Sequence, residues 1–388
     1  MLLDPETAEP GPGALLLEEG RIAACLRDGD PLPEDAERVD LGGRALAPGF
    51  VDLHHHGSAI FAGPEQLAAA VRHDSAELAR HGCTAFLATT VAMPAQDLVA
   101  HVEGLAMALE AGDTPGARPL GLHLEGPWIA AAAAGAQPPA GIRDFDPAEA
   151  EDLLAAAGGS LRMVTLAPEL PGANALLSLL GRKGLVAALG HSTAEPAQVA
   201  AAAEAGASHV THLFNAMGSM HHRAPGLAGA ALSDDRLTCD IICDGAHVSP
   251  GWVRVAARSK GERLLLITDR IDPARIHSEA AAETFGSGEL QSDGVALRLP
   301  DGRLAGSCVT LARAARNAAE FGAMTQLEAI AACTLRPARV LGLEAEVGTL
   351  RAGARADLVV LEADGSVGET WLGGSRLGDS VGPTGPSA

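Results

Sequence analysis

Histidine and acidic residues recur at the ends of short apolar runs along this chain, where their side chains could gather into one site. These residues are His54, His55, His56, Glu125, His191, His212, Asp244, His247 and Asp269. Imidazole and carboxylate groups are common protein ligands of zinc and related divalent metals. Any single histidine among them could equally be a surface group or a satisfied core group. The prediction of a metal site therefore rests on the whole set.

Glu125, His191 and His212 can supply three protein ligands to a metal ion. Three protein ligands leave one position of a tetrahedral zinc ion open for water, which is the pattern of catalytic zinc sites. Asp269 is the natural general base beside such a site, because a carboxylate can take a proton from an attacking water and pass it to a leaving amine. The alternative for Asp269 is that it only caps a helix after the strand.

His54 and His56 could bind a second metal ion, because residues i and i+2 of a strand point to the same face. The histidine between them should point away. Some binuclear hydrolases bridge their two metals with a carbamylated lysine, but the only lysines here are Lys183 and Lys260, and both precede predicted strands. Glu125 is therefore the candidate bridge if two ions are present.

Eight apolar runs that alternate with alanine-rich stretches indicate the frame that carries these residues. We expect strands at residues 47–53, 84–89, 119–124, 161–167, 185–190, 209–213, 239–243 and 264–268. Strands that alternate with helices indicate parallel βαβ units, and eight such units predict an α/β protein with a (β/α)8 TIM-type barrel. The active site of such a barrel lies at the C-terminal ends of its strands, where six of the eight predicted strands deliver His, Glu or Asp.

The two ends of the chain read differently from its middle. Residues 1–47 and 344–372 contain short apolar runs and turns, and neither segment is long enough for a core of its own. We therefore expect both to form one small β-sandwich domain beside a catalytic barrel at residues 48–343. Residues 373–388 are rich in Gly, Ser and Pro, so we expect a disordered tail.

The composition narrows the class of protein further. The formal net charge of -21 argues against nucleic acid as a partner, although one local arginine can still bind a small phosphorylated substrate. Six cysteines without a CxxC pair fit a reducing cytoplasm. Neither a signal peptide nor an apolar run of about 18 residues is apparent, so we expect no membrane partner.

Several motifs, taken together and in order, resemble those of one family. They are APGFVDLHHHG, LHLEGPW, LGHSTA, THLFNAM, RAPGLAGAAL, ICDGAHVSP, ITD, LAGSCVTL, PARVLGL and GTLRAGARADLVVL, spread over residues 45–362. On these motifs the chain resembles the N-acetylglucosamine-6-phosphate deacetylases of the amidohydrolase superfamily. LHLEGPW and THLFNAM are specific to that family, whereas PGFVD and ADLVVL occur across the superfamily.

The resemblance implies metal-dependent hydrolysis of the acetamide of a phosphorylated amino sugar. It implies a divalent metal, zinc by default with iron as the alternative, in one or two copies. It assigns Glu125, His191, His212, His54 and His56 as metal ligands and Asp269 as the catalytic acid and base. It also implies a homodimer or homotetramer in which a neighbouring subunit helps to close the phosphate site. The positions that match substrate contacts are Ala136, Gln137, Asn215, Ala216, Arg223, His247, Leu304, Ala305, Gly306 and Ser307.

Three departures from the family pattern concern the substrate more than the chemistry. Ala136 and Gln137 stand where the family usually has a basic stretch that ends in Gly-Ala-His or similar; Arg270 follows the catalytic Asp269, and residues 272–294 are atypical. One alternative is therefore a related amidohydrolase that acts on another N-acyl compound, such as an N-acetylgalactosamine phosphate. The other alternative is a relative without activity that keeps the fold as a binding or assembly module.

Overall fold

Eight short parallel strands form the centre of the computed structural model, which describes residues 1–378 apart from residues 8, 28, 32 and 279–289. The strands are β4 (Phe50–Gly57), β5 (Cys83–Thr89), β6 (Arg118–Glu125), β7 (Leu161–Leu166), β8 (Val186–Leu189), β9 (His209–Val210), β10 (Thr238–Ile242) and β11 (Leu264–Ile267). Each pairs in parallel with the next along the chain. Their residues are almost all buried, which explains why they read as continuous apolar runs.

The sheet curls until its last strand meets its first. The amide of Asp269, just after β11, donates to the carbonyl oxygen of His54 at 2.9 Å, and β12 (Arg270–Ile271) pairs in parallel with β4. This arrangement is consistent with the predicted TIM-type barrel. The sheet continues beyond β12 with three strands that were not predicted, β15 (Leu304–Ser307), β14 (Ala296–Arg298) and β13 (Gln291–Ser292). β15 pairs in parallel with β12, and β14 and β13 follow as antiparallel neighbours.

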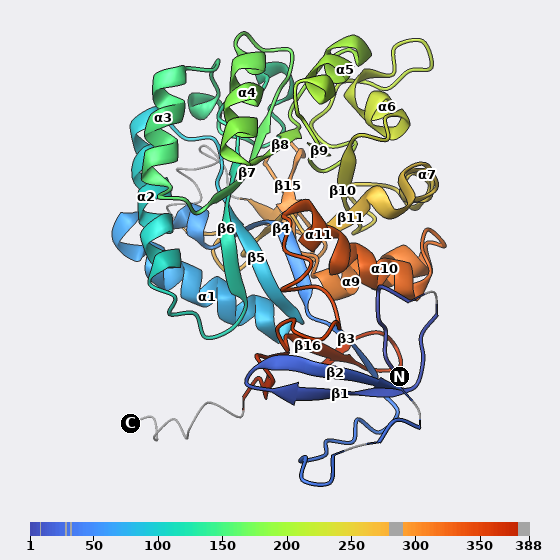
Figure 1. Cartoon of the computed structure of the whole chain (residues 1–388). Helices are drawn as coiled ribbons and strands as arrows, with labels where there is room; N and C mark the ends of the chain where they lie inside the picture. The colour runs from blue at the N-terminus through green and yellow to red at the C-terminus, as the bar shows by residue number, and fades with distance from the viewer. Residues whose placement is uncertain (8, 28, 32, 279–289, 379–388) are drawn as a thin grey trace.

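Helices surround the central strands (Figure 1). They are α1 (Leu67–Arg80), α2 (Ala95–Glu110), α3 (Pro147–Ala156), α4 (Ala173–Lys183), α5 (Pro196–Glu204), α6 (Gly226–Ser233), α7 (Pro250–Lys260), α9 (Leu311–Glu320), α10 (Gln326–Cys333) and α11 (Leu335–Val340). Their buried faces are largely alanine and leucine and share one continuous apolar core with the strands. In the part of the chain described above, the helices are too short or too polar to span a bilayer.

Both ends of the chain contribute to two small sheets beside the barrel (Figure 1). The hairpin of β1 (Gly13–Glu18) and β2 (Arg21–Arg27) turns at Glu19 and Gly20, as the sequence predicts. The second sheet has the order β18 (Ser375–Arg376), β17 (Val367–Leu372), β16 (Leu358–Leu361) and β3 (Ala45–Pro48). One apolar cluster joins residues of both sheets. The description of this unit as a β-sandwich domain with the stated boundaries stays a prediction.

Three predicted segments end elsewhere than expected. The strand expected at 47–53 is two strands, because β3 joins the small sheet and β4 runs on to Gly57. The strand expected at 209–213 stops at Val210, since His212 and Phe214 adopt left-handed backbone angles. The tail was expected to be disordered from residue 373, but its residues 375–376 form strand β18, which pairs with β17. Residues 379–388 lie outside the described chain.

Asp74 of α1 fixes the end of β4. Its carboxylate accepts hydrogen bonds from the amide of Ser58 at 2.9 and 3.0 Å, and a Cβ on Gly57 would lie 2.3 Å from one of its oxygens. Glycine is therefore required at position 57, where φ is +60°. Burial raises the pKa of Asp74 to about 7, although the hydrogen bonds from Ser58 act in the opposite direction.

We expect Asp74→Asn to flatten the pH dependence of stability. A folded pKa of about 7 against an ordinary value of 3.8 means that the folded state holds this proton more tightly. The contribution is therefore complete below about pH 4 and is lost as the pH rises to about 7, by at most ~1.4 kcal/mol per pH unit. Urea unfolding between pH 5 and 8 measures this slope. Asp97→Asn, on the exposed start of α2, is the control; a variant with the parent's slope would contradict the assignment.

Candidate functional site

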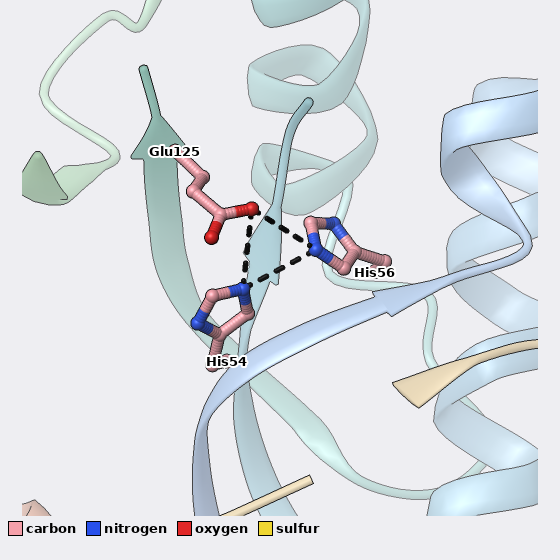
Figure 2. Close-up of side chains that lie close together, drawn as sticks. All are labelled: His54, His56 and Glu125. Atoms are coloured by element: carbon pink, nitrogen blue, oxygen red, sulfur yellow. Dashed lines mark hydrogen bonds and ion pairs between the residues drawn. The ribbon is translucent and has the colours of Figure 1, made fainter. Parts of the chain in front are cut away.

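The imidazoles of His54 and His56 turn toward the carboxylate of Glu125 (Figure 2). The two histidines lie on β4 and Glu125 ends β6, so the three side chains meet across the intervening strand β5. The Nε2 atoms of His54 and His56 lie 3.4 and 3.2 Å from Glu125 Oε2, and 3.2 Å from each other. His55, between them, points away from this group and lines a separate small cavity, as strand alternation predicts.

The second oxygen of Glu125 faces two further histidines. His191 follows β8 and His212 follows β9, and their Nε2 atoms lie 3.0 and 2.9 Å from Glu125 Oε1. The same two nitrogen atoms are 3.1 Å apart. Glu125 thus belongs to two groups of potential ligand atoms, one with His54 and His56 and one with His191 and His212.

The chemistry of this cluster fits divalent metal ions. All five side chains are nearly inaccessible to solvent, and four imidazole nitrogens face one carboxylate. Burial alone would lower the pKa of His56 and His212. Hydrogen bonds and charge from Asp269 and Glu125 nevertheless raise the pKa of His56 to about 10, and those from Glu125 above all raise the pKa of His212 to about 9. The cluster therefore attracts positive charge, which two metal ions sharing Glu125 would supply.

Hydrogen bonds to backbone carbonyl oxygens orient two of the histidines. Nδ1 of His56 lies 3.2 Å from the carbonyl oxygen of Thr89, and Nδ1 of His191 lies 3.0 Å from that of Ala133. A carbonyl oxygen can only accept, so each Nδ1 carries a proton, and the lone pair of each Nε2 would be the one available to a metal ion. Nδ1 of His54 and Nδ1 of His212 are buried without a hydrogen-bond partner among the described residues.

Asp269 faces the first of these groups. Its Oδ1 lies 3.3 Å from Nε2 of His54 and 3.2 Å from Nε2 of His56. Burial alone would raise the pKa of Asp269, but the imidazoles of His54 and His56 hold it below its ordinary value, so the carboxylate is ionised. The alternative of a helix N-cap is wrong, because the residues that follow form strand β12.

A cavity of about 240 Å³ opens onto the cluster. Most of the residues singled out in the sequence line it. They are His56, Glu125, Ala136, Gln137, His191, His212, Asn215, Ala216, His247, Asp269, Leu304, Ala305 and Gly306. Sequence reasoning missed four other lining residues, Val91, Gly135, Ile271 and Arg303. Gly135 directly precedes Ala136, and Arg303 directly precedes Leu304. This adjacency to predicted substrate contacts was the one sequence signal that could have identified them.

Two predicted substrate contacts lie outside the cavity lining. Arg223 is exposed on the turn after β9, and its guanidinium lies 2.9 Å from Nε2 of His222. Ser307 is buried and donates from Oγ to the carbonyl oxygen of Thr268 at 2.5 Å, while its amide donates to that of Asp269. Within one chain, Ser307 therefore supports the backbone of Asp269, and Arg223 stands on the surface.

The three departures from the family pattern lie in different parts of the structure. The amide group of Gln137 is engaged at both ends, since Nε2 donates to Glu125 Oε2 at 2.5 Å and Oε1 accepts from the amide of Ala92 at 2.7 Å. Arg270 does not line the active-site cavity; together with His55 it borders the separate small cavity. Of the atypical segment 272–294, residues 279–289 lie outside the described chain.

Comparisons with known proteins find the amidohydrolase family and, within it, deacetylases of amino sugar phosphates. Residues 45–377 match the amidohydrolase family. An N-acetylgalactosamine-6-phosphate deacetylase of Escherichia coli O157:H7 is 35% identical over 364 residues, covering 93% of each chain. A human N-acetylglucosamine-6-phosphate deacetylase is 35% identical over 388 residues, covering 97% of this chain and 89% of its own.

A solved structure is similar over the same length. It is a mutant N-acetyl-D-glucosamine-6-phosphate deacetylase from Mycobacterium smegmatis in complex with N-acetyl-D-glucosamine-6-phosphate. It superimposes with a TM-score of 0.84 at 34% identity, covering 97% of both chains. The chain therefore belongs to the amidohydrolase family, in its group of N-acetylglucosamine-6-phosphate deacetylases.

Proposed function

We propose that this chain hydrolyses the acetamide of N-acetyl-D-glucosamine 6-phosphate to glucosamine 6-phosphate and acetate. The observation that carries the proposal is the position of Asp269, a buried carboxylate in contact with the His and Glu cluster at the floor of a cavity. Relatives that share about a third of the sequence carry this activity in their names.

Asp269 has the position and charge of a general base. Its carboxylate takes the proton from the attacking water and then delivers it to the departing sugar amine. A divalent metal, when bound, acidifies that water and polarises the acetamide carbonyl. The amide group of Gln137 is already engaged with Glu125 and Ala92. Nδ1 of His247 lies 2.6 Å from the carboxylate of Asp244, so in the neutral imidazole Nδ1 carries the proton and Nε2 presents its lone pair to the cavity, where it can accept a hydrogen bond from a hydroxyl group of the sugar.

The ligand set supports zinc as the default metal and iron as the alternative. Glu125, His191 and His212 would hold one ion, and His54 and His56 would hold a second with Glu125 as the bridge. The chain has no lysine near this cluster that could supply a bridging carbamate, since Lys260 is buried beside Ala231 and Asp234.

N-Acetylgalactosamine 6-phosphate is the second candidate substrate. One observation favours it specifically: a relative named for that activity is as similar to this chain as the human deacetylase is. The two sugars differ only in the orientation of one hydroxyl group, so the same metal chemistry serves both.

The surface position of Arg223 bears on the phosphate. A guanidinium suits bidentate binding of a phosphate, but Arg223 lies outside the cavity of its own chain. A homodimer or homotetramer, in which Arg223 reaches the cavity of a neighbouring subunit, accounts for both facts. A cytoplasmic location fits the six cysteines, all of which are free thiols.

Rates on four sugars test the substrate assignment. We expect N-acetylglucosamine 6-phosphate to exceed N-acetylgalactosamine 6-phosphate and both unphosphorylated sugars in kcat/KM. Arg223→Ala should lower kcat/KM about ten- to a hundredfold for the phosphorylated sugars only, because a charged hydrogen bond contributes roughly 1.5–3 kcal/mol. Arg236→Ala, an exposed arginine paired with Asp234, serves as control. A parent enzyme without preference for the phosphate would defeat the assignment.

Metal content separates the two ligand groups. We expect the double variant His54→Ala and His56→Ala to bind one ion fewer than the parent and to keep measurable activity. Glu125→Ala should lose both ions, because both groups share this carboxylate. Elemental analysis after dialysis gives the stoichiometry, and the exposed pair His73→Ala and His81→Ala is the control. Full activity in metal-free parent protein would refute the metal dependence.

Asp269→Asn tests the proton transfer. Asparagine has nearly the same shape but cannot take up the proton, so kcat should fall by about 100- to 10,000-fold while substrate binding and metal content persist. Asp272→Asn, three residues along the chain and paired with the exposed His73, should keep the parent rate. If Asp269→Asn stays within a few-fold of the parent, the base must be another group.

A further inference from the structure

One wall of the cavity is a loop of residues 131–138, which contacts two of the proposed metal ligands. The carbonyl oxygen of Ala133 accepts from Nδ1 of His191, and the side chain of Gln137 donates to Glu125. A Cβ on Gly135 would lie 3.4 Å from Cε1 of His191, so the backbone of this 131–138 loop lies directly against that ring.

The 131–138 loop has little side-chain bulk with which to hold this position. Residues 131–134 are all alanine, and Gly135 has a left-handed backbone with φ +59°. Ala136 packs its methyl group on the apolar cluster beneath β14 and β15. The position of the 131–138 loop therefore depends on the hydrogen bonds that it makes to residues other than the proposed metal ligands.

Arg303, which also lines the cavity, supplies such a hydrogen bond. It stands in the turn between β14 and β15, and its Nη1 donates to the carbonyl oxygen of Gly135 at 2.5 Å. Nε of the same guanidinium donates to Oδ2 of Asp301 at 2.7 Å, and Oδ1 of Asp301 accepts from the Arg303 amide at 3.0 Å. Asp301 thus aims the guanidinium, and the charge-assisted hydrogen bond crosses from the hairpin to the loop.

We propose that Arg303 is a positioning residue for the metal centre. By fastening Gly135, it holds the 131–138 loop so that Ala133 fixes the proton on His191 and Gln137 orients the carboxylate of Glu125. Groups that hydrogen-bond directly to metal ligands typically change metal affinity or activity by about 10- to 100-fold when removed. Arg303 acts one contact further out, through Gly135, so we expect an effect at the lower end of that range. This inference rests on the metal-dependent activity proposed above, but its main readouts need no substrate.

Three variants test the role of Arg303. In Arg303→Ala we expect the dissociation constant for zinc, measured by chelator competition, to rise about tenfold. Amide exchange of residues 131–138 should accelerate by a similar factor in the zinc-loaded protein. Arg303→Lys should recover most of both losses, because an ammonium group can still donate to Gly135. Arg298→Ala is the control on the same hairpin: Arg298 pairs with the exposed Asp293 and donates to the carbonyl oxygen of Gly302 at 3.3 Å, so its polar contacts stay within the hairpin and the variant should behave as the parent.

The results of these measurements distinguish failure of the role proposed for Arg303 from failure of the proposed function. Parent-like zinc affinity and loop exchange in Arg303→Ala would overturn the proposal, as would equal losses in Arg298→Ala, which would indicate a loosened hairpin. A parent protein that binds no zinc would overturn it as well. A parent that binds zinc but deacetylates neither sugar phosphate would defeat the proposed function alone, because the comparison of zinc affinities would still decide the role of Arg303.

Discussion

The Glu125 carboxylate is the group around which the site is organised. It is 2% exposed, and each of its oxygens faces two imidazoles. Burial raises the pKa of an isolated carboxyl, but the histidines, His54 and His191 first among them, hold the pKa of Glu125 well below its ordinary value. It therefore stays ionised in the interior, where a charge without partners would be very costly. The strands β4, β6, β8 and β9 must bring those partners within about 3 Å, which fixes their relative register.

Reaching this carboxylate requires unusual backbone at three strand ends. His191, His212 and Asp269 have φ values of 46°, 35° and 49°, in the left-handed region. Each such residue costs on the order of 1 kcal/mol, and neighbouring hydrogen bonds offset the cost. The amide of His212 donates to the buried Asp240, and the carbonyl oxygen of Asp269 accepts from Ser307 at 2.9 Å. The turns that end β9 and β11 thus aim the side chains into the cavity, and this is why β9 is shorter than its apolar run suggests.

Sequence reasoning found the elements whose signals are local. Buried parallel strands read as apolar runs, so all eight central strands were located within a few residues, and the alternation of side chains separated His55 from its two neighbours. The positions of Arg223 and Arg303 depend instead on how a turn folds back, which no period in the sequence encodes. The family motif placed Arg223 near the substrate, but Arg223 lies on the surface. No sequence pattern distinguished Arg303 from the other arginines, but Arg303 lines the cavity. The 131–138 loop, in which five of eight residues are alanine, likewise has no sequence pattern that predicts its position.

The net charge of the site depends on the number of bound metal ions, and this charge affects the binding of a phosphorylated substrate. Glu125 and Asp269 together contribute -2 when the imidazoles are neutral. One divalent ion brings this sum to 0, and two bring it to +2. A sugar phosphate carries about -1.5 to -2 at neutral pH, and it must approach a chain whose formal charge is -21. Two ions would balance the negative charge of the phosphate from within the site. With one ion, arginines at the rim of the cavity would have to balance that charge. The need for Arg223 should therefore be greatest in protein that holds a single ion, and the ligands His54 and His56 and the phosphate contact form one electrostatic system.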